Sequence, residues 1–330
     1  MSTFAAVVLF AGVVAYAVLG GADFGAGFWD LAAGGAERGR RPRHLVDESL
    51  APVWEANHVW LIFCLVMMWT AFPTAFAAIM TTLYVPLGLT ALGIVMRGSG
   101  FAFRKVVVQT DQQRVVGAAF ALSSIVSPFF LGTVAGGIAS GRVPTRGYGD
   151  PVTSWVNPTS VLGGVLAILA CAFTAAVFLT AEARRRDDDE LERYFRRRAQ
   201  VTAVVTGVVA LVGIAVLHAD APQLFDGLLS RGLPLVVLSG VCGLLALLLL
   251  NRAAPRLLQG LAVAAVASVV VGWGVAQYPY LLGTHLSIQV AAAPTSTLWS
   301  LTLVAAAALV LVVPSLGLLF SLQQRGRLEA

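Results

Sequence analysis

The sequence has few charged residues for its length. Asp, Glu, Lys and Arg make up 12% of the 330 residues, whereas soluble domains carry about 25%. Apolar residues make up 58%, and the mean hydropathy is +0.83. This shortage of polar surface excludes a water-soluble globular protein, and the high hydrophobicity excludes a disordered chain. Most of the chain must therefore be solvated by lipid.

Cysteine is scarce as well. The three cysteines, Cys64, Cys171 and Cys242, lie inside apolar runs and form no Cys-x-x-Cys pair. The sequence therefore encodes no disulfide framework, no cysteine zinc site and no c-type haem attachment. The net charge of +5 comes from residues that lie mainly between the apolar runs, so it does not indicate a nucleic-acid partner.

Long stretches without charge dominate the chain. A membrane-spanning helix needs about 20 largely apolar residues. Two of the charge-free stretches are long enough for two helices each, and they divide at Pro73 and at the polar segment 277–297. The sequence predicts an all-α polytopic membrane protein that forms a single integral membrane domain over 1–330. About nine transmembrane helices are expected, at 3–21, 50–71, 76–98, 116–139, 159–182, 201–219, 233–251, 258–278 and 298–322.

Basic residues predict the orientation of these helices, because cytoplasmic loops are enriched in Lys and Arg. With the N-terminus outside, all but three of the 22 Lys and Arg residues fall on the cytoplasmic side; the exceptions are Arg142, Arg146 and Arg231. We therefore expect an external N-terminus and a cytoplasmic C-terminus. No basic segment precedes the first helix, so we expect it to be retained. The mixed-charge segment 184–198 is expected to be a solvated helical extension at the cytoplasmic surface.

A few ionisable residues lie near the predicted helices, where burial makes them functional candidates. Glu55 and His58 stand one helical turn apart, and Glu48 lies two turns before Glu55 on much the same side. Such a carboxylate suits proton uptake and transfer, but the two residues equally suit a hydrogen-bonded pair that fixes helix packing. Both interpretations stay open. Arg97 and Arg104 could clamp an anionic group, although anchoring at the cytoplasmic surface explains both.

No metal site is predicted within this chain. Glu55-x-x-His58 is half of a di-iron carboxylate pattern, and the sequence contains no second Glu-x-x-His. The other histidines, His44, His218 and His285, map to loops or helix ends, which disfavours a bis-histidine haem.

The glycine-rich segment 20–30 does not predict a nucleotide site either. No strand precedes it, and Asp30 stands where a dinucleotide motif requires its third glycine. We expect the small residues to allow close helix approach, or a backbone turn at the membrane surface.

Several segments resemble subunit II of cytochrome bd-type quinol oxidases. They are YAVLGGADFGAGFWD at 16–30, PVWEANHVWL at 52–61, AFPTAFA at 71–77, LYVPLGL at 83–89, LGIVMRGSGFAFR at 92–104, SWVNPTSVLGG at 154–164, LERYFRRRA at 191–199 and YPYLL at 278–282. The resemblance covers nearly the whole chain in order, and nine helices with an external N-terminus is also the family's architecture. His58 stands where many relatives have Glu, which indicates a divergent branch.

The resemblance implies a complex in the bacterial cytoplasmic membrane that oxidises quinol, reduces dioxygen to water and takes protons from the cytoplasm. Haems b and d would belong to subunit I, so this chain alone is expected to bind no haem and to lack catalysis. It would support the haem region of subunit I and, as in some members, hold a structural quinone. Membrane lipids and quinol are further expected partners, a small accessory subunit is left open, and no nucleic acid is expected.

The resemblance also implies a proton path along the subunit interface. Glu55 takes the place of the acid in the Pro-Val-Trp motif, and Asp23 that of the acid in the glycine-rich motif. With His58 and Glu48, these residues are the candidates for the proton path.

Two other functions stay open: a proton-coupled secondary transporter and a purely structural scaffold subunit. The charge-free stretch 257–324 offers no ionisable residue at mid-membrane depth, which disfavours the transporter.

Overall fold

A computed structural model describes residues 1–35, 37–50, 54–104, 110–145 and 147–324, without the side chains at 50, 54–56, 101, 104, 110–115, 313, 320, 323 and 324. The described chain is almost entirely helical, which confirms the all-α prediction. The helices are α1 (Ser2–Ala32), α2 (Arg40–Leu50), α3 (Trp54–Ala71), α4 (Pro73–Thr82), α5 (Tyr84–Arg104), α6 (Thr110–Ala139), α7 (Pro158–Arg185), α8 (Asp189–Asp220), α9 (Pro222–Ser230), α10 (Leu233–Leu249), α11 (Pro255–Gln277), α12 (Ile288–Ala291) and α13 (Thr295–Gln324). Strands β1 (Tyr280–Leu282) and β2 (Leu286–Ser287) form a small antiparallel hairpin between α11 and α12.

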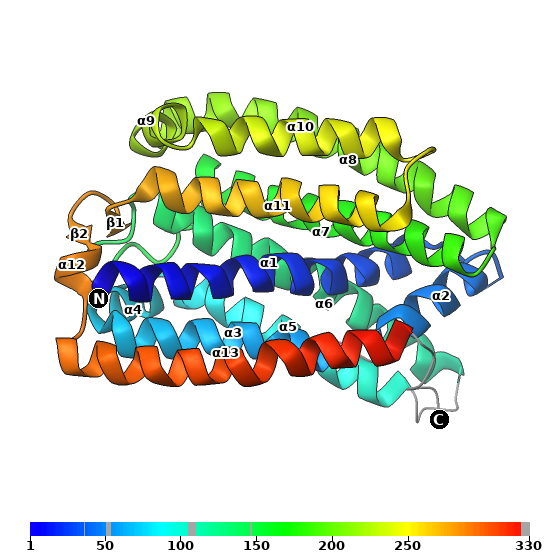
Figure 1. Cartoon of the computed structure of the whole chain (residues 1–330), viewed down its shortest axis with the longest axis horizontal. Helices are drawn as coiled ribbons and strands as arrows, with labels where there is room; N and C mark the ends of the chain where they lie inside the picture. Colours follow the sequence, from blue (N-terminus) through cyan, green and yellow to red (C-terminus); the bar gives the residue numbers. More distant parts are fainter. Residues whose placement is uncertain (36, 51–53, 105–109, 146, 325–330) are drawn as a thin grey trace.

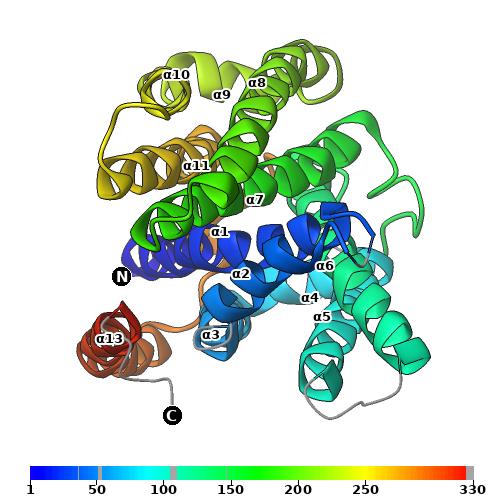
Figure 2. The same ribbon diagram turned by 90° about the vertical axis from the view of Figure 1, so that its right-hand side faces the viewer.

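The long helices lie side by side along one axis (Figure 1). One end carries α2 and the turn between α7 and α8, and we call it the α2 end. The other end carries the N-terminus, α4, α9 and the hairpin, and we call it the N-terminal end. Helices α1 and α7 pack against each other near the middle of the bundle, and both contact α6 (Figure 2). Helix α13 lies at the edge, mainly against α3.

Local sequence explains where most helices begin. Prolines occupy the first position of α4, α7, α9 and α11, where a backbone N–H has no helical partner to lose. The Asn157 side chain caps α7 by accepting a hydrogen bond from the Ser160 N–H, at 2.9 Å. Asp188 caps α8 in the same way through the Leu191 N–H, at 3.0 Å.

Six of the described helices are long and apolar enough to cross a membrane, or up to eight if each of two bent pairs forms one span. The pairs are α3 with α4, bent by 118°, and α9 with α10, bent by 79°. The chain is therefore a multi-pass membrane protein. The expected total of nine spans and the orientation of the termini stay predictions.

The helix expected at 76–98 is divided at Leu83 into α4 and α5. Pro86 lies in the first turn of α5 and has no N–H to donate to the Thr82 carbonyl, so the hydrogen-bond ladder cannot run through this point. The prediction of one continuous helix there is wrong.

Helix α1 continues to Ala32 instead of ending near residue 21. Its glycines let other helices approach the backbone directly. A Cβ atom on Gly25 would lie 1.9 Å from the Cys171 carbonyl oxygen of α7, and one on Gly27 would lie 2.1 Å from the Ser124 Oγ of α6. The expected close helix approach is therefore confirmed. The alternative of a backbone turn is wrong, because the segment keeps its helical hydrogen bonds.

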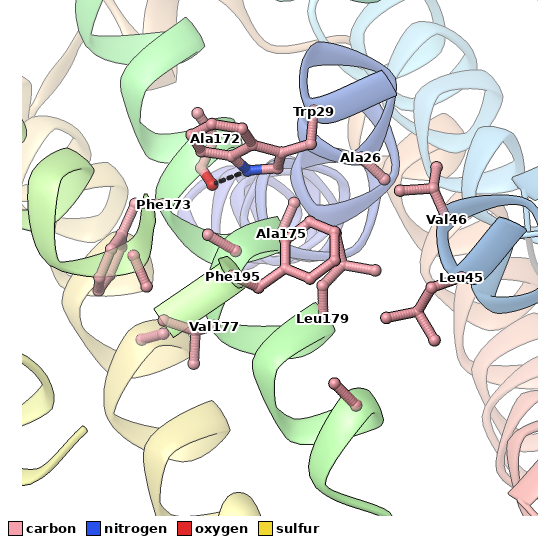
Figure 3. Packing of buried hydrophobic residues seen from close by; sticks show 14 of the residues in the cluster. Ala26, Trp29, Leu45, Val46, Ala172, Phe173, Ala175, Val177, Leu179 and Phe195 are labelled. Carbon is pink, nitrogen blue, oxygen red and sulfur yellow. Dashed lines mark hydrogen bonds between the residues drawn. The ribbon is translucent and has the colours of Figure 1, made fainter. Parts of the chain in front are cut away.

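Helix α2 was not foreseen from the sequence. Its polar face is strongly charged, but Leu45 and Val46 are almost fully buried, at 2% and 1% exposure. They join a core with Phe195 and with Trp29, whose Nε1 donates to the Ala172 carbonyl at 2.8 Å (Figure 3). Tertiary burial of one short face thus stabilises a helix whose average polarity suggests a loop.

Candidate functional site

A buried ion pair joins α1 to α5. The side chains of Asp23 and Arg97 are 1% and 2% exposed, and Arg97 Nη2 lies 2.7 Å from Asp23 Oδ1. The same Nη2 donates to the Asp23 backbone carbonyl at 2.9 Å, and Arg97 Nη1 donates to the Ser124 hydroxyl of α6. A charge buried without a partner is costly, so each of these charges needs the other. The pair therefore connects three helices inside the bundle.

Two aromatic rings enclose the Arg97 guanidinium. Its Cζ lies 5.1 Å from the centre of the Phe24 ring and 4.6 Å from the centre of the Phe120 ring, distances typical of cation–π contacts. The interpretation of Arg97 as a surface anchor is wrong, because its guanidinium lies inside the chain and binds a carboxylate of the same chain.

His58 packs edge-on against two rings of α1, and one of them, Phe24, also contacts Arg97. Its ring centre is 6.3 Å from that of Tyr16 and 6.2 Å from that of Phe24. Neighbouring Asn57 is 4% exposed and donates to the Leu19 carbonyl at 3.2 Å, which fixes this turn of α3 on α1. Since Phe24 contacts both His58 and Arg97, the fold brings His58 and Asp23 into one region.

Two other candidates have side chains outside the described part of the chain. Glu55 lies in the first turn of α3, one turn before His58, and Arg104 is the last residue of α5. Their roles in a proton path and in anion binding stay predictions.

Glu48 lies on α2, in an ion-pair network at the α2 end. Its half-exposed carboxylate accepts a hydrogen bond from Arg186, and His44 Nδ1 lies 3.4 Å from it. Arg41 also ties α2 to the α7–α8 turn, through Asp188 at 2.8 Å. The Leu191 N–H and the Arg41 guanidinium lower the pKa of Asp188 below its ordinary value. The structure thus places Glu48 at the surface and Asp23 in the interior.

Sequence reasoning named Asp23 and Arg97 separately but missed that they pair. It also missed Tyr16 and Ser124. The signal was available for the pair, because single charges of opposite sign within apolar helices usually bind each other. The partners that carry no charge left no comparable signal.

Among the described residues, no three His, Cys, Asp or Glu side chains lie close enough together to bind a metal ion. His44 is exposed at the α2 end, whereas His218 packs on the Phe225 ring, 4.8 Å between centres, near the N-terminal end. These two histidines therefore lie at opposite ends of the bundle.

A cavity of about 210 Å³ opens at the N-terminal end, lined in part by Ser140, Thr284 and His285. Ligand pockets usually start near about 300 Å³ and are mostly apolar. The small volume and polar lining do not fit an isoprenoid quinone, so we assign none to this cavity.

Comparison with known proteins shows which family this sequence matches. The family model described as cytochrome bd terminal oxidase subunit II matches residues 1–323. Cytochrome bd ubiquinol oxidase subunit 2 of Bacillus subtilis is 28% identical over 226 residues, which cover 68% of this chain and 64% of that protein. Cytochrome bd-I ubiquinol oxidase subunit 2 of Escherichia coli K12 is 29% identical over 214 residues, which cover 62% and 54%. The aligned region therefore spans between half and two thirds of these relatives.

The fold matches a solved structure over nearly its full length. A chain of the bd oxidase from Geobacillus thermodenitrificans superposes with a TM-score of 0.82 at 25% identity. The match covers 97% of this chain and 98% of that one, so the helix arrangement is shared throughout.

Proposed function

Because the chain belongs to the family of cytochrome bd terminal oxidase subunit II, we propose that it is the non-haem subunit of a quinol:dioxygen oxidoreductase in a bacterial cytoplasmic membrane. The complex oxidises quinol and reduces dioxygen to water. Haems b and d of subunit I transfer the electrons to dioxygen. The observation that carries this proposal is the family match over residues 1–323, together with the full-length fold match.

We further propose that this chain supports the haem region of subunit I and supplies protons from the cytoplasm. Support for a proton path comes from the position of His58, which packs on Phe24, the residue after Asp23, and lies one turn after Glu55. A proton enters at Glu55, passes to the His58 imidazole, whose two nitrogens can accept and release a proton, and continues toward Asp23. Arg97 holds the Asp23 carboxylate in place, and the Ser124 hydroxyl accepts a hydrogen bond from the same guanidinium.

The position of the entrance is consistent with the charge distribution. The α2 end carries Arg41 of α2 and Arg186 of the α7–α8 turn, and α3 begins on the same side of the bundle (Figure 1). If this end faces the cytoplasm, as the basic residues predict, the path begins on the side from which protons are taken.

Purification of this chain from its native membrane in mild detergent tests the proposal. We expect a second, larger membrane subunit to co-purify, haem b and haem d bands in the reduced-minus-oxidised spectrum, and oxygen uptake that depends on quinol. A colourless, intact preparation without a partner would overturn the proposal and redirect the work to proton-coupled transport assays.

Replacing Glu55 by Gln tests proton supply separately from assembly. We expect Glu55→Gln to retain the complex and its haem spectrum while turnover falls by more than about tenfold, because the carboxylate that takes up the proton is lost. Glu37→Gln is the matched control, since Glu37 is an exposed carboxylate outside the helices. If both variants keep full turnover with the complex intact, the chain is a structural scaffold.

A further inference from the structure

Three buried polar atoms at the Asp23–Arg97 pair have no hydrogen-bond partner among the residues that the structure describes. They are the Tyr16 hydroxyl, the second carboxylate oxygen Oδ2 of Asp23 and Nε of Arg97. Buried polar groups are almost always hydrogen-bonded, and an unpaired one costs free energy. Three such atoms in one cluster therefore require a common explanation.

The Tyr16 ring points along α1 toward Asp23. A Cβ atom on Gly20 would lie only 3.0 Å from Tyr16 Cε2, so the ring lies directly over Gly20, one turn further along the helix. The ring also packs edge-on against Phe24, 6.4 Å between centres. Because Asp23 lies between Gly20 and Phe24 in the sequence, the hydroxyl at the tip of the ring extends to the turn that carries the carboxylate.

The hydrogen-bonding capacities of the three atoms are complementary to water. Asp23 Oδ2 accepts, Arg97 Nε–H donates, and the Tyr16 hydroxyl does both. A buried water typically makes about three hydrogen bonds to polar groups that otherwise lack partners. Direct bonds do not join the three atoms, so bridging water is the simplest way to satisfy all of them.

We propose that Tyr16 is a positioning residue that holds ordered water against Asp23 Oδ2 and Arg97 Nε, and that this water connects His58 to Asp23. This inference rests on the proposed role in proton supply and names a residue through which it acts. The hydroxyl orients the water, and the water passes a proton on by accepting one on its oxygen and releasing another toward Asp23 Oδ2. No net charge remains on the water after the transfer.

The site has charged and titratable neighbours on several helices. His58 and Cys64 of α3, Arg97 of α5 and Cys171 of α7 surround Tyr16, together with Asp23 of its own helix. The Arg97 charge is balanced by Asp23, so removal of the Tyr16 hydroxyl changes the hydrogen bonding of the site but not its charge.

Tyr16→Phe in the whole complex tests this proposal, because it removes only the hydroxyl. We expect normal assembly and haem content, turnover lower by about two- to tenfold as for one lost hydrogen bond, and a larger ratio of rates in H2O and D2O. A purely structural role would leave that isotope ratio unchanged. Tyr148→Phe is the control, since Tyr148 is 87% exposed in a connecting segment.

Measuring Glu55→Gln in the same series separates the two proposals. If Glu55→Gln is slow and Tyr16→Phe has normal turnover and isotope ratio, the inference about Tyr16 is overturned and proton supply by the chain stands. If both variants behave as the parent complex, both proposals are overturned.

An experimental map of the parent complex provides an independent test. We expect an ordered water within hydrogen-bonding distance of the Tyr16 hydroxyl and Asp23 Oδ2. A map that shows other buried waters but none at this place would overturn the inference, whatever Tyr16→Phe does to turnover.

Discussion

At the scale of single residues, Arg97 shows how an apolar bundle accommodates a full charge. The guanidinium binds the Asp23 carboxylate and backbone and the Ser124 hydroxyl, and it lies between two aromatic rings. Asp23 and Arg97 are 74 positions apart in the sequence, so their pairing depends on how α1 and α5 are arranged around α6, which both contact.

Removing one member of the pair should be costly. We expect Arg97→Leu to destabilise the protein by about 3–5 kcal/mol, because Asp23 would stay buried without its cation. The double variant Asp23→Leu/Arg97→Leu should recover much of this loss, since two apolar side chains need no partners. Thermal unfolding midpoints of the detergent-solubilised complex measure both effects.

Arg256→Leu is the control for this comparison, because Arg256 is exposed at the start of α11. A melting midpoint for Arg97→Leu equal to that of Arg256→Leu would show that the buried pair contributes little to stability.

At the scale of helices, small residues determine how closely α1 and α7 approach. The Gly25 backbone touches the Cys171 carbonyl, and the Trp29 indole donates to the next carbonyl of α7, that of Ala172. These two contacts fix the distance between the helices and their rotation relative to each other, and thereby the position of the Asp23 turn.

A side chain at Gly25 should force these helices apart. We expect Gly25→Ala to lower stability by about 3 kcal/mol or more, because the atom it would strike belongs to the backbone of α7. Gly207→Ala is the matched control, since a Cβ atom at Gly207 in α8 meets no atom within 4 Å. It should be neutral or stabilising by up to about 1 kcal/mol, because alanine favours helix. Equal melting midpoints for the two variants would contradict the close approach.

At the scale of the whole molecule, the two ends of the bundle differ in how many charged residues they carry. The α2 end gathers the ion pairs of Arg41, Arg184 and Arg186, whereas the N-terminal end holds Arg142 with Asp220 and Arg231 on the carbonyl of Tyr278. Few basic residues at the N-terminal end are consistent with an external location.

Accessibility to a membrane-impermeant thiol reagent tests this orientation. We expect Tyr148→Cys to react in intact cells, and Arg193→Cys to react only after the membrane is opened. Both residues are exposed, and the α6–α7 connection and the start of α8, which carry them, lie at opposite ends of the bundle (Figure 1). The reverse pattern would invert the topology and remove the cytoplasmic entrance from the proposed proton path.

Low pH should destabilise the packing at the α2 end, because the Asp188 carboxylate becomes protonated. Its folded-state pKa lies below the ordinary value of 3.8, so the ionised carboxylate stabilises the fold above that value, and this stabilisation is lost as the pH falls through the folded-state pKa. Asp188→Asn keeps a good helix cap but does not titrate. We expect the parent to melt above the variant at neutral pH and this difference to shrink in acid. A difference in melting temperature that does not change with pH would contradict the lowered pKa of Asp188.

Sequence alone determined the features that depend on composition and local pattern. The shortage of charge required a membrane protein, prolines and capping residues set most helix starts, and the order of the motifs identified the family. Apolar runs without charge were long enough to reveal most spans, because each spanning helix needs about 20 largely apolar residues.

The tertiary structure alone decided which groups meet. Three contacts join segments that are distant in sequence. They are the Asp23–Arg97 ion pair, the packing of His58 against Tyr16 and Phe24, and the burial of α2 against α1 and α7. Local propensity carries no information about such contacts, since they follow from the rotation and spacing of neighbouring helices. That packing depends on glycines of α1 that allow the backbone of α7 to approach closely, and it sets the positions of Tyr16, Asp23 and Arg97 relative to one another.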